Sequence, residues 1–117
     1  MSDINEIKEK LREFSRERDW DKFHSPKNLA MALSVEVAEL LEHFQWLTED
    51  ESRSISGGAK AEVADEIADV QVYLIRLADK LGVDIFESVA QKIKKNEEKY
   101  PADKVRGSSK KYTEYKE

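Results

Sequence analysis

Two glutamates lie where apolar residues are expected, in the inner stripes of two helical segments. On a helical wheel at about 100° per residue, Glu36 falls inside the apolar stripe of residues 26–47, and Glu66 falls inside that of residues 59–81. The two stripes consist of Leu29, Leu33, Leu40 and Leu47, and of Val63, Val70, Leu74 and Leu77. Because an amphipathic helix keeps its acids on the solvent face, the pattern predicts carboxylates in the contact between these helices.

Each of these glutamates has a second acid one helical turn away. Glu39 lies about 60° to one side of the first stripe, and Asp69 lies at the edge of the second. If the stripes face each other, the four carboxylates converge inside the protein. Burying unpaired carboxylates among like charges is costly, and neither stripe has a lysine or arginine within one turn of them. Either some of these acids hold protons, or a divalent cation lies among them.

The types of side chain limit which cation this would be. Oxygen ligands alone suit Mg²⁺ or Mn²⁺. Zinc prefers nitrogen or sulfur, but the chain has no cysteine and only two histidines, His24 and His43. The paired E-x-x-H motifs of di-iron carboxylate bundles are absent from the sequence. A single E-x-x-E motif is common on solvated helix faces, but two acidic pairs, each centred on an apolar stripe, favour a metal site.

Local signals predict four helices. They are expected over residues 3–18, 26–47, 59–81 and 84–100. Ser25-Pro26 is typical of a helix start, with a hydroxyl N-cap followed by proline in the first turn. Gly82 is typical of a helix end, and Asp84, with Glu87 three residues later, resembles a capping box. We therefore expect an all-α protein, an antiparallel four-helix bundle joined by loops.

The remaining segments are expected to be irregular. Residues 19–24 and 48–58 are predicted as loops, the latter containing Gly57-Gly58. The chain of 117 residues fits one domain, with the helical domain expected over residues 1–101 and a tail over 102–117. Arg106, Lys110 and Lys111 could make that tail a lid over bound phosphates, although a mobile basic tail fits equally well.

Charge and hydropathy exclude several classes of function. The formal net charge of −5 argues against binding of a nucleic acid polymer, which requires a basic surface. No apolar run approaches the roughly 20 residues that span a bilayer, and the charged N-terminus is unlike a signal peptide. A cytoplasmic protein is expected.

The two acidic pairs also carry a resemblance to a known family. Glu36-Val37-Ala38-Glu39 and Glu66-Ile67-Ala68-Asp69, separated by residues 40–65, resemble the signature of the MazG-like, all-α nucleoside triphosphate pyrophosphatases, and most closely their dCTP pyrophosphatase branch. The similarity extends over residues 18–24, Pro26-Lys27-Asn28-Leu29, Phe44-Gln45-Trp46, Tyr73-Leu74, Lys92, Asn96, Tyr100-Pro101 and residues 108–114. The segment between the second and third helices is shorter than in animal members.

The resemblance implies Mg²⁺-dependent hydrolysis of dCTP, and of modified dCTP, to the monophosphate and pyrophosphate, which would cleanse the nucleotide pool. It implies that Glu36, Glu39, Glu66 and Asp69 bind the metal, with Mn²⁺ as a possible substitute. Glu36 or Glu39 would also accept the proton of the attacking water. It further implies a homotetramer built from dimers.

The resemblance also assigns the substrate contacts. Lys92 and Asn96, one helical turn apart, would contact phosphate and sugar. Trp20, His24 and Trp46 would select the base, since aromatic rings stack on bases and a histidine can read the pyrimidine edge. Tyr73 is expected either to join them or to pack beside the carboxylates, and His43 either to bond Glu39 or to take part in the chemistry.

Two other functions remain compatible with the sequence. One is the same reaction on another nucleotide, such as dUTP or a damaged nucleotide, because few pocket contacts set specificity. The other is a non-catalytic helical adaptor. The inward acidic pairs argue against the adaptor, which has no use for them.

Overall fold

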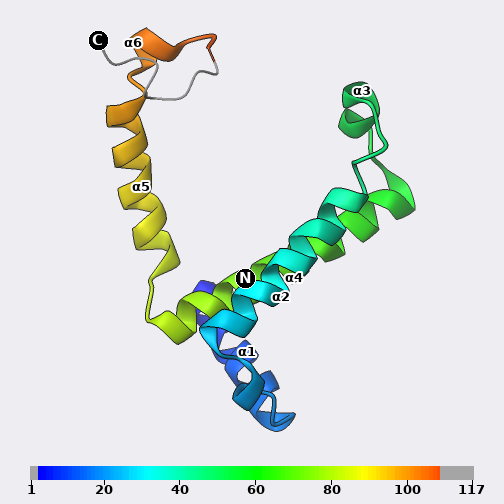
Figure 1. Ribbon diagram of the computed structural model, residues 1–117, viewed down its shortest axis with the longest axis vertical. Coiled ribbons are helices and arrows are strands. Elements are labelled where there is room, and N and C mark those ends of the chain that lie inside the picture. The colour runs from blue at the N-terminus through cyan, green and yellow to red at the C-terminus, as the bar shows by residue number, and fades with distance from the viewer. Residues whose placement is uncertain (1–2, 109–117) are drawn as a thin grey trace. The chain divides into compact units, whose positions relative to one another are not determined.

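A computed structural model describes residues 3–108 and contains only helices as regular elements within that range (Figure 1). The all-α prediction is confirmed. None of the described helices is long and apolar enough to cross a membrane. The elements are α1 (Ile4–Glu17), η1 (Asp21–Phe23), α2 (Pro26–Glu42), α3 (Glu49–Arg53), α4 (Gly57–Leu81), α5 (Ile85–Lys99) and α6 (Ala102–Val105).

The predicted helix boundaries at three polar or glycine caps are confirmed. The Ser25 hydroxyl accepts a hydrogen bond from the backbone N–H of Asn28, and Pro26 opens α2. Asp84 caps α5 in the same way by accepting from the N–H of Glu87. Gly82 ends α4 in the left-handed conformation, with φ of 67°, which glycine adopts without steric cost.

The predicted extension of the second helix to Leu47 is wrong, because α2 ends at Glu42. The backbone N–H groups of His43, Phe44 and Leu47 each donate to the carbonyl three residues earlier, so the chain tightens into turns. The apolar spacing that suggested a longer helix continues through these turns. The backbone N–H of Gln45 still donates to the carbonyl of Leu41 in the α-helical pattern, but the tighter bonds around it end the regular helix.

Three segments predicted as irregular contain short helices. Thr48 and Glu51 form a capping box that starts α3 inside the predicted loop 48–58. The loop before α2 contains η1, and the predicted tail begins with α6. Lys110 and Lys111, assigned to a possible lid, lie outside the described residues.

Contacts divide the chain into two compact units with the boundary between Val83 and Asp84. In the first unit, α2 and α4 lie side by side and run in opposite directions (Figure 1), and α1 contacts α4. Leu29, Ile75 and Ala78 form the buried apolar core, with Leu29 only 1% exposed. Arg12 of α1 binds both carboxylate oxygens of Asp79, at 2.7 and 2.5 Å, which fastens α1 to α4.

The second unit contains α5 and α6. Phe86, Val89 and Ile93 share one face of α5, and each is at least half exposed. The place of this helix in a four-helix bundle stays a prediction.

The left-handed glycine at the end of α4 generates a stability prediction. Gly82→Ala adds a Cβ that meets no atom within 4 Å, so its cost is conformational, about 1–2 kcal/mol. Gly58→Ala is the matched control, because its Cβ also meets no atom and its φ is not positive. This control is expected to stabilise α4 by about 0.4–1 kcal/mol. Urea unfolding measures both, and equal effects of the two substitutions would contradict the assignment.

Candidate active site

Three of the four predicted metal ligands come together between α2 and α4. Glu36 and Glu39 lie one turn apart on α2, and Glu66 lies on the antiparallel α4. One carboxylate oxygen from each lies within 4.8 Å of the others. The helical spacing of three residues on α2 places two acids toward the same neighbour, and the packing of α4 against α2 supplies the third.

Among residues 3–83, the carboxylates of this cluster have no cationic partner. Oε2 of Glu36 and Oε2 of Glu66 are buried and accept no hydrogen bond from the described residues. Within residues 3–83, no lysine or arginine forms an ion pair with Glu36, Glu39, Glu66 or Asp69. Unpaired buried acids hold their protons more tightly than exposed acids.

The pKa values of Glu36 and Glu66 are both raised in this buried, acidic cluster. Burial, followed by the facing carboxyl groups of Glu66 and Glu39, raises the pKa of Glu36 from 4.5 to about 7. Burial, followed by the carboxyl groups of Glu39 and Asp69, also raises the pKa of Glu66. At neutral pH the cluster therefore favours retention of a proton, or binding of a cation that replaces it.

The donor set fits a divalent cation. Three carboxyl groups from two rigid helices offer oxygen alone, the ligand that hard cations prefer. Two of their oxygens are buried and have no partner among the described residues. A bound cation would offset the mutual repulsion of these groups. The cluster is thus suited to hold such an ion.

A cavity of about 350 Å³ adjoins the acidic cluster through Glu36. This volume lies in the range of small-molecule sites. Asp69 is not part of the three-carboxylate group but lines the cavity together with Glu36. Three of the predicted substrate-binding residues line the same cavity, namely Trp20, His24 and Tyr73.

The segment between α1 and α2 fixes the aromatic wall of this cavity. The backbone N–H of Trp20 donates to the carbonyl of Ser15, and the indole meets the Phe14 ring edge to face, at 5.7 Å between centroids. The guanidinium of Arg18 lies 3.6 Å from the centroid of the same Phe14 ring. Such contacts hold a flat ring in a defined orientation, which suits a surface on which a base stacks.

The other predicted contacts lie elsewhere. Trp46 follows the end of α2, is 87% exposed and does not line the cavity. Lys92 and Asn96 lie on α5 in the second unit and are exposed, and His43 is the half-buried C-cap of α2. The roles of these four residues stay predictions.

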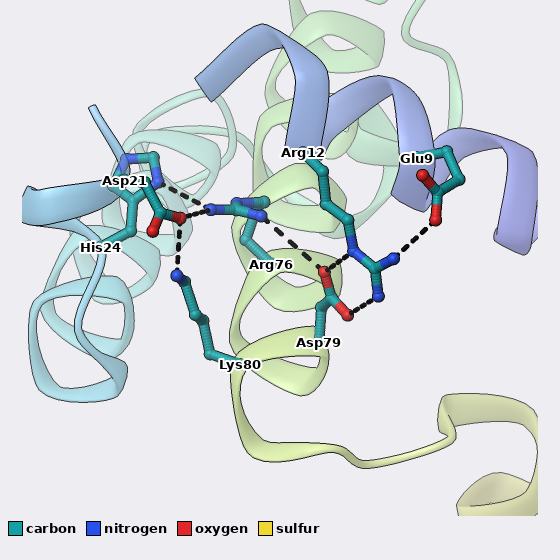
Figure 2. Close-up of polar contacts among 7 residues, drawn as sticks. All are labelled: Glu9, Arg12, Asp21, His24, Arg76, Asp79 and Lys80. Carbon is teal, nitrogen blue, oxygen red and sulfur yellow. Dashed lines mark hydrogen bonds and ion pairs between the residues drawn. The ribbon is translucent and has the colours of Figure 1, made fainter. Parts of the chain in front are cut away.

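Arg76 of α4 is a cavity residue that the sequence reasoning missed. Its side chain is 4% exposed, and its Nη2 donates to Oδ1 of Asp21 at 3.1 Å and approaches Nδ1 of His24 at 3.3 Å (Figure 2). Its Nη1 lies 3.8 Å from Oδ2 of Asp79. Burial, followed by the positive charge of Arg76, lowers the pKa of His24. Arg76 thus ties the loop that carries His24 to α4.

Because the acidic cluster has no cationic partner within residues 3–83, we expect a divalent cation to raise the free energy of unfolding. In protein freed of metal, Mg²⁺ at about 100 times its Kd should stabilise the fold by about 2.7 kcal/mol. Glu36→Gln removes a ligand and should lose most of that gain, whereas Glu42→Gln, on the exposed end of α2, should keep it. Thermal unfolding with and without Mg²⁺ measures the effect, and an equal gain in all three proteins would exclude Glu36 as a ligand.

The raised pKa of Glu36 sets the pH dependence of the same experiment. Between its ordinary value of 4.5 and about 7, the folded protein binds more protons at this group than the unfolded chain does. Its contribution to the stability of the metal-free protein therefore falls as the pH rises across that window. Glu36→Gln should remove this part of the slope.

The chain is similar in sequence to a known protein family and to named proteins. A sequence model of the MazG-like family matches residues 31–115. Proteins named dCTP pyrophosphatase 1 from Homo sapiens and Mus musculus are 42% and 40% identical to the chain over 113 residues. The aligned region covers 95% of this chain and 66% of each relative, so the chain spans about two thirds of their length.

A solved structure is also similar. A pyrophosphatase from Archaeoglobus fulgidus DSM 4304 is 47% identical and superposes with a TM-score of 0.81, over 86% of this chain and 94% of the other. The family match includes both acidic pairs and extends over most of the sequence. The chain therefore belongs to the MazG-like family.

Proposed function

We propose that the protein is a Mg²⁺-dependent pyrophosphohydrolase that converts dCTP, and modified dCTP, to dCMP and pyrophosphate. The observation that carries this proposal is the shared boundary of the acidic cluster and the aromatic cavity at Glu36. An acidic cluster that holds a cation suits a triphosphate, and an aromatic cavity suits a base. The names of the relatives from Homo sapiens and Mus musculus support dCTP as the substrate.

Glu36, Glu39 and Glu66 would hold the cation, together with Asp69 from the adjoining turn of α4. When bound, Mg²⁺ would supply charge neutralisation at the phosphate oxygens and a lowered pKa for water, and Mn²⁺ could replace it. Glu36 or Glu39 accepts the proton of the attacking water, because both carboxylates lie in the cluster. The rigidity of α2 and α4 holds these acceptors in place.

The base occupies the cavity beside the carboxylates. Trp20 stacks on its face, a contact that contributes about 1–3 kcal/mol, and its orientation by Phe14 supports this role. His24 and Tyr73 border the same space and contact the base or sugar. Lys92 and Asn96 bind phosphate and sugar, Trp46 completes base recognition, and residues 102–117 act as a lid.

The proposal also includes a homotetramer in the cytoplasm, where the nucleotide pool is available. Many apolar side chains of this small chain are exposed, and they extend over several helices. On α2, α4 and α5 they include Met31, Val35, Leu41, Ile67, Phe86, Val89 and Ile93. Exposed apolar surface of this extent is typical of subunit interfaces.

Pyrophosphate release from a panel of nucleoside triphosphates tests the activity. The wild type with Mg²⁺ should prefer dCTP, and Glu39→Gln should lower kcat by about 10²-fold or more, since it removes a proton acceptor and a metal ligand. Glu42→Gln, which alters an exposed carboxylate on the same helix, should retain activity. Activity that survives Glu39→Gln would contradict the site, and equal rates on all nucleotides would contradict the dCTP assignment.

Light scattering coupled to gel filtration tests the assembly. The wild type should elute with the mass of four chains. Phe86→Glu places a charge on the exposed apolar face of α5 and should yield a smaller species, because burying an unpaired charge in an interface is unfavourable. Gln91→Glu, an exposed polar position on the same helix, is the control. A monomeric wild type would contradict the tetramer.

A further inference from the structure

Arg76 places one of its nitrogens between an acid and the histidine of the cavity. Its Nη2 carries two hydrogens, and two acceptor atoms lie within hydrogen-bonding distance, Oδ1 of Asp21 at 3.1 Å and Nδ1 of His24 at 3.3 Å (Figure 2). The Arg76 side chain is 4% exposed, so solvent competes little for these bonds. Both hydrogens of Nη2 are thus directed to defined partners.

The direction of the bond to His24 follows from the chemistry of arginine. A guanidinium only donates hydrogen bonds and stays charged, so Nδ1 of His24 must accept. A neutral imidazole with an accepting Nδ1 carries its proton on Nε2. Burial and the charge of Arg76 both lower the pKa of His24, which favours the neutral ring. His24 therefore presents an N–H donor, not an acceptor, at its second nitrogen.

We propose that Arg76 is a positioning residue that holds His24 in the Nε2–H tautomer and so gives the cavity a hydrogen-bond donor that selects cytosine over uracil. This inference rests on the proposed function. The ring nitrogen N3 of cytosine is an acceptor, whereas N3 of uracil carries a hydrogen, so a fixed donor pairs with the first and opposes the second. A buried donor that loses its acceptor lowers affinity.

Arg76 can be replaced without leaving either neighbouring acid unpaired. Oδ1 of Asp21 also accepts from Nζ of Lys80 at 2.6 Å, and Asp79 remains bound by Arg12. Within residues 3–83, Nδ1 of His24 is the one acceptor that depends on Arg76 alone. Arg76→Met therefore removes the constraint on the tautomer, whereas Lys80→Met removes the other cation on Asp21 and leaves His24 bonded.

The tautomer is measured directly by nitrogen NMR of protein labelled with ¹⁵N-histidine. Only His24 and His43 contribute signals, and a His43→Gln variant assigns them. The wild type and Lys80→Met should show His24 as the Nε2–H form at neutral pH, and Arg76→Met should show both tautomers. A wild-type His24 with its proton on Nδ1, or a charged ring, would overturn the inference even if Arg76→Met failed to fold.

Substrate preference supplies the second measurement. Arg76→Met should lower the ratio of kcat/KM for dCTP over dUTP by about threefold to tenfold, the equivalent of one hydrogen bond, and Lys80→Met should leave the ratio unchanged. An equal loss on both nucleotides would mean that Arg76 binds phosphate or supports the fold, and would overturn the inference. A wild type inactive on every nucleotide would instead contradict the proposed function, and the tautomer would then decide the role of Arg76.

Discussion

Mutual repulsion among carboxylates in the contact between α2 and α4 is the constraint on which the rest of the structure depends. Packing these helices against each other brings one carboxylate oxygen each of Glu36, Glu39 and Glu66 within 4.8 Å of the others. Two oxygens of this cluster are buried and have no partner within residues 3–108. The apolar stripes that pair the helices cannot form without bringing these charges together. Protonation relieves part of the cost, as the raised pKa of Glu36 indicates, and a divalent cation relieves more of it.

The cavity is lined by the same two helices, by α1 and by the segment between α1 and α2. Glu36 borders both the acidic cluster and the cavity, and Trp20 and His24 come from the segment between α1 and α2. Arg76 joins this segment to α4 through Asp21 and His24 (Figure 2). The polar contacts thus hold the aromatic wall of the cavity at a fixed position beside the carboxylates, which is the preorganisation that the proposed reaction would require.

The sequence predicted those features that depend on local spacing. The caps at Ser25, Gly82 and Asp84 define helix boundaries within a few residues, and the acids inside the apolar stripes indicated the cluster.

Arg76 was missed because its role depends on the long-range approach of Asp21 and His24. Val72 and Ile75, which lie four residues and one residue before Arg76, extend the apolar residues of α4 beyond one stripe and could have indicated a second packed face. The helix at 49–53 was missed although Thr48-x-x-Glu51 matches a capping box.

We expect a divalent cation to join the carboxylates of Glu36, Glu39 and Glu66. Anomalous diffraction from crystals soaked in Mn²⁺ tests it most directly, since manganese replaces Mg²⁺ at oxygen sites and its position is seen independently of the protein atoms. An anomalous peak is expected among the three carboxylates, at about 2.0–2.3 Å from their oxygens. Well-ordered crystals with no peak there, and with a lysine or arginine of another subunit bound to these carboxylates instead, would contradict it.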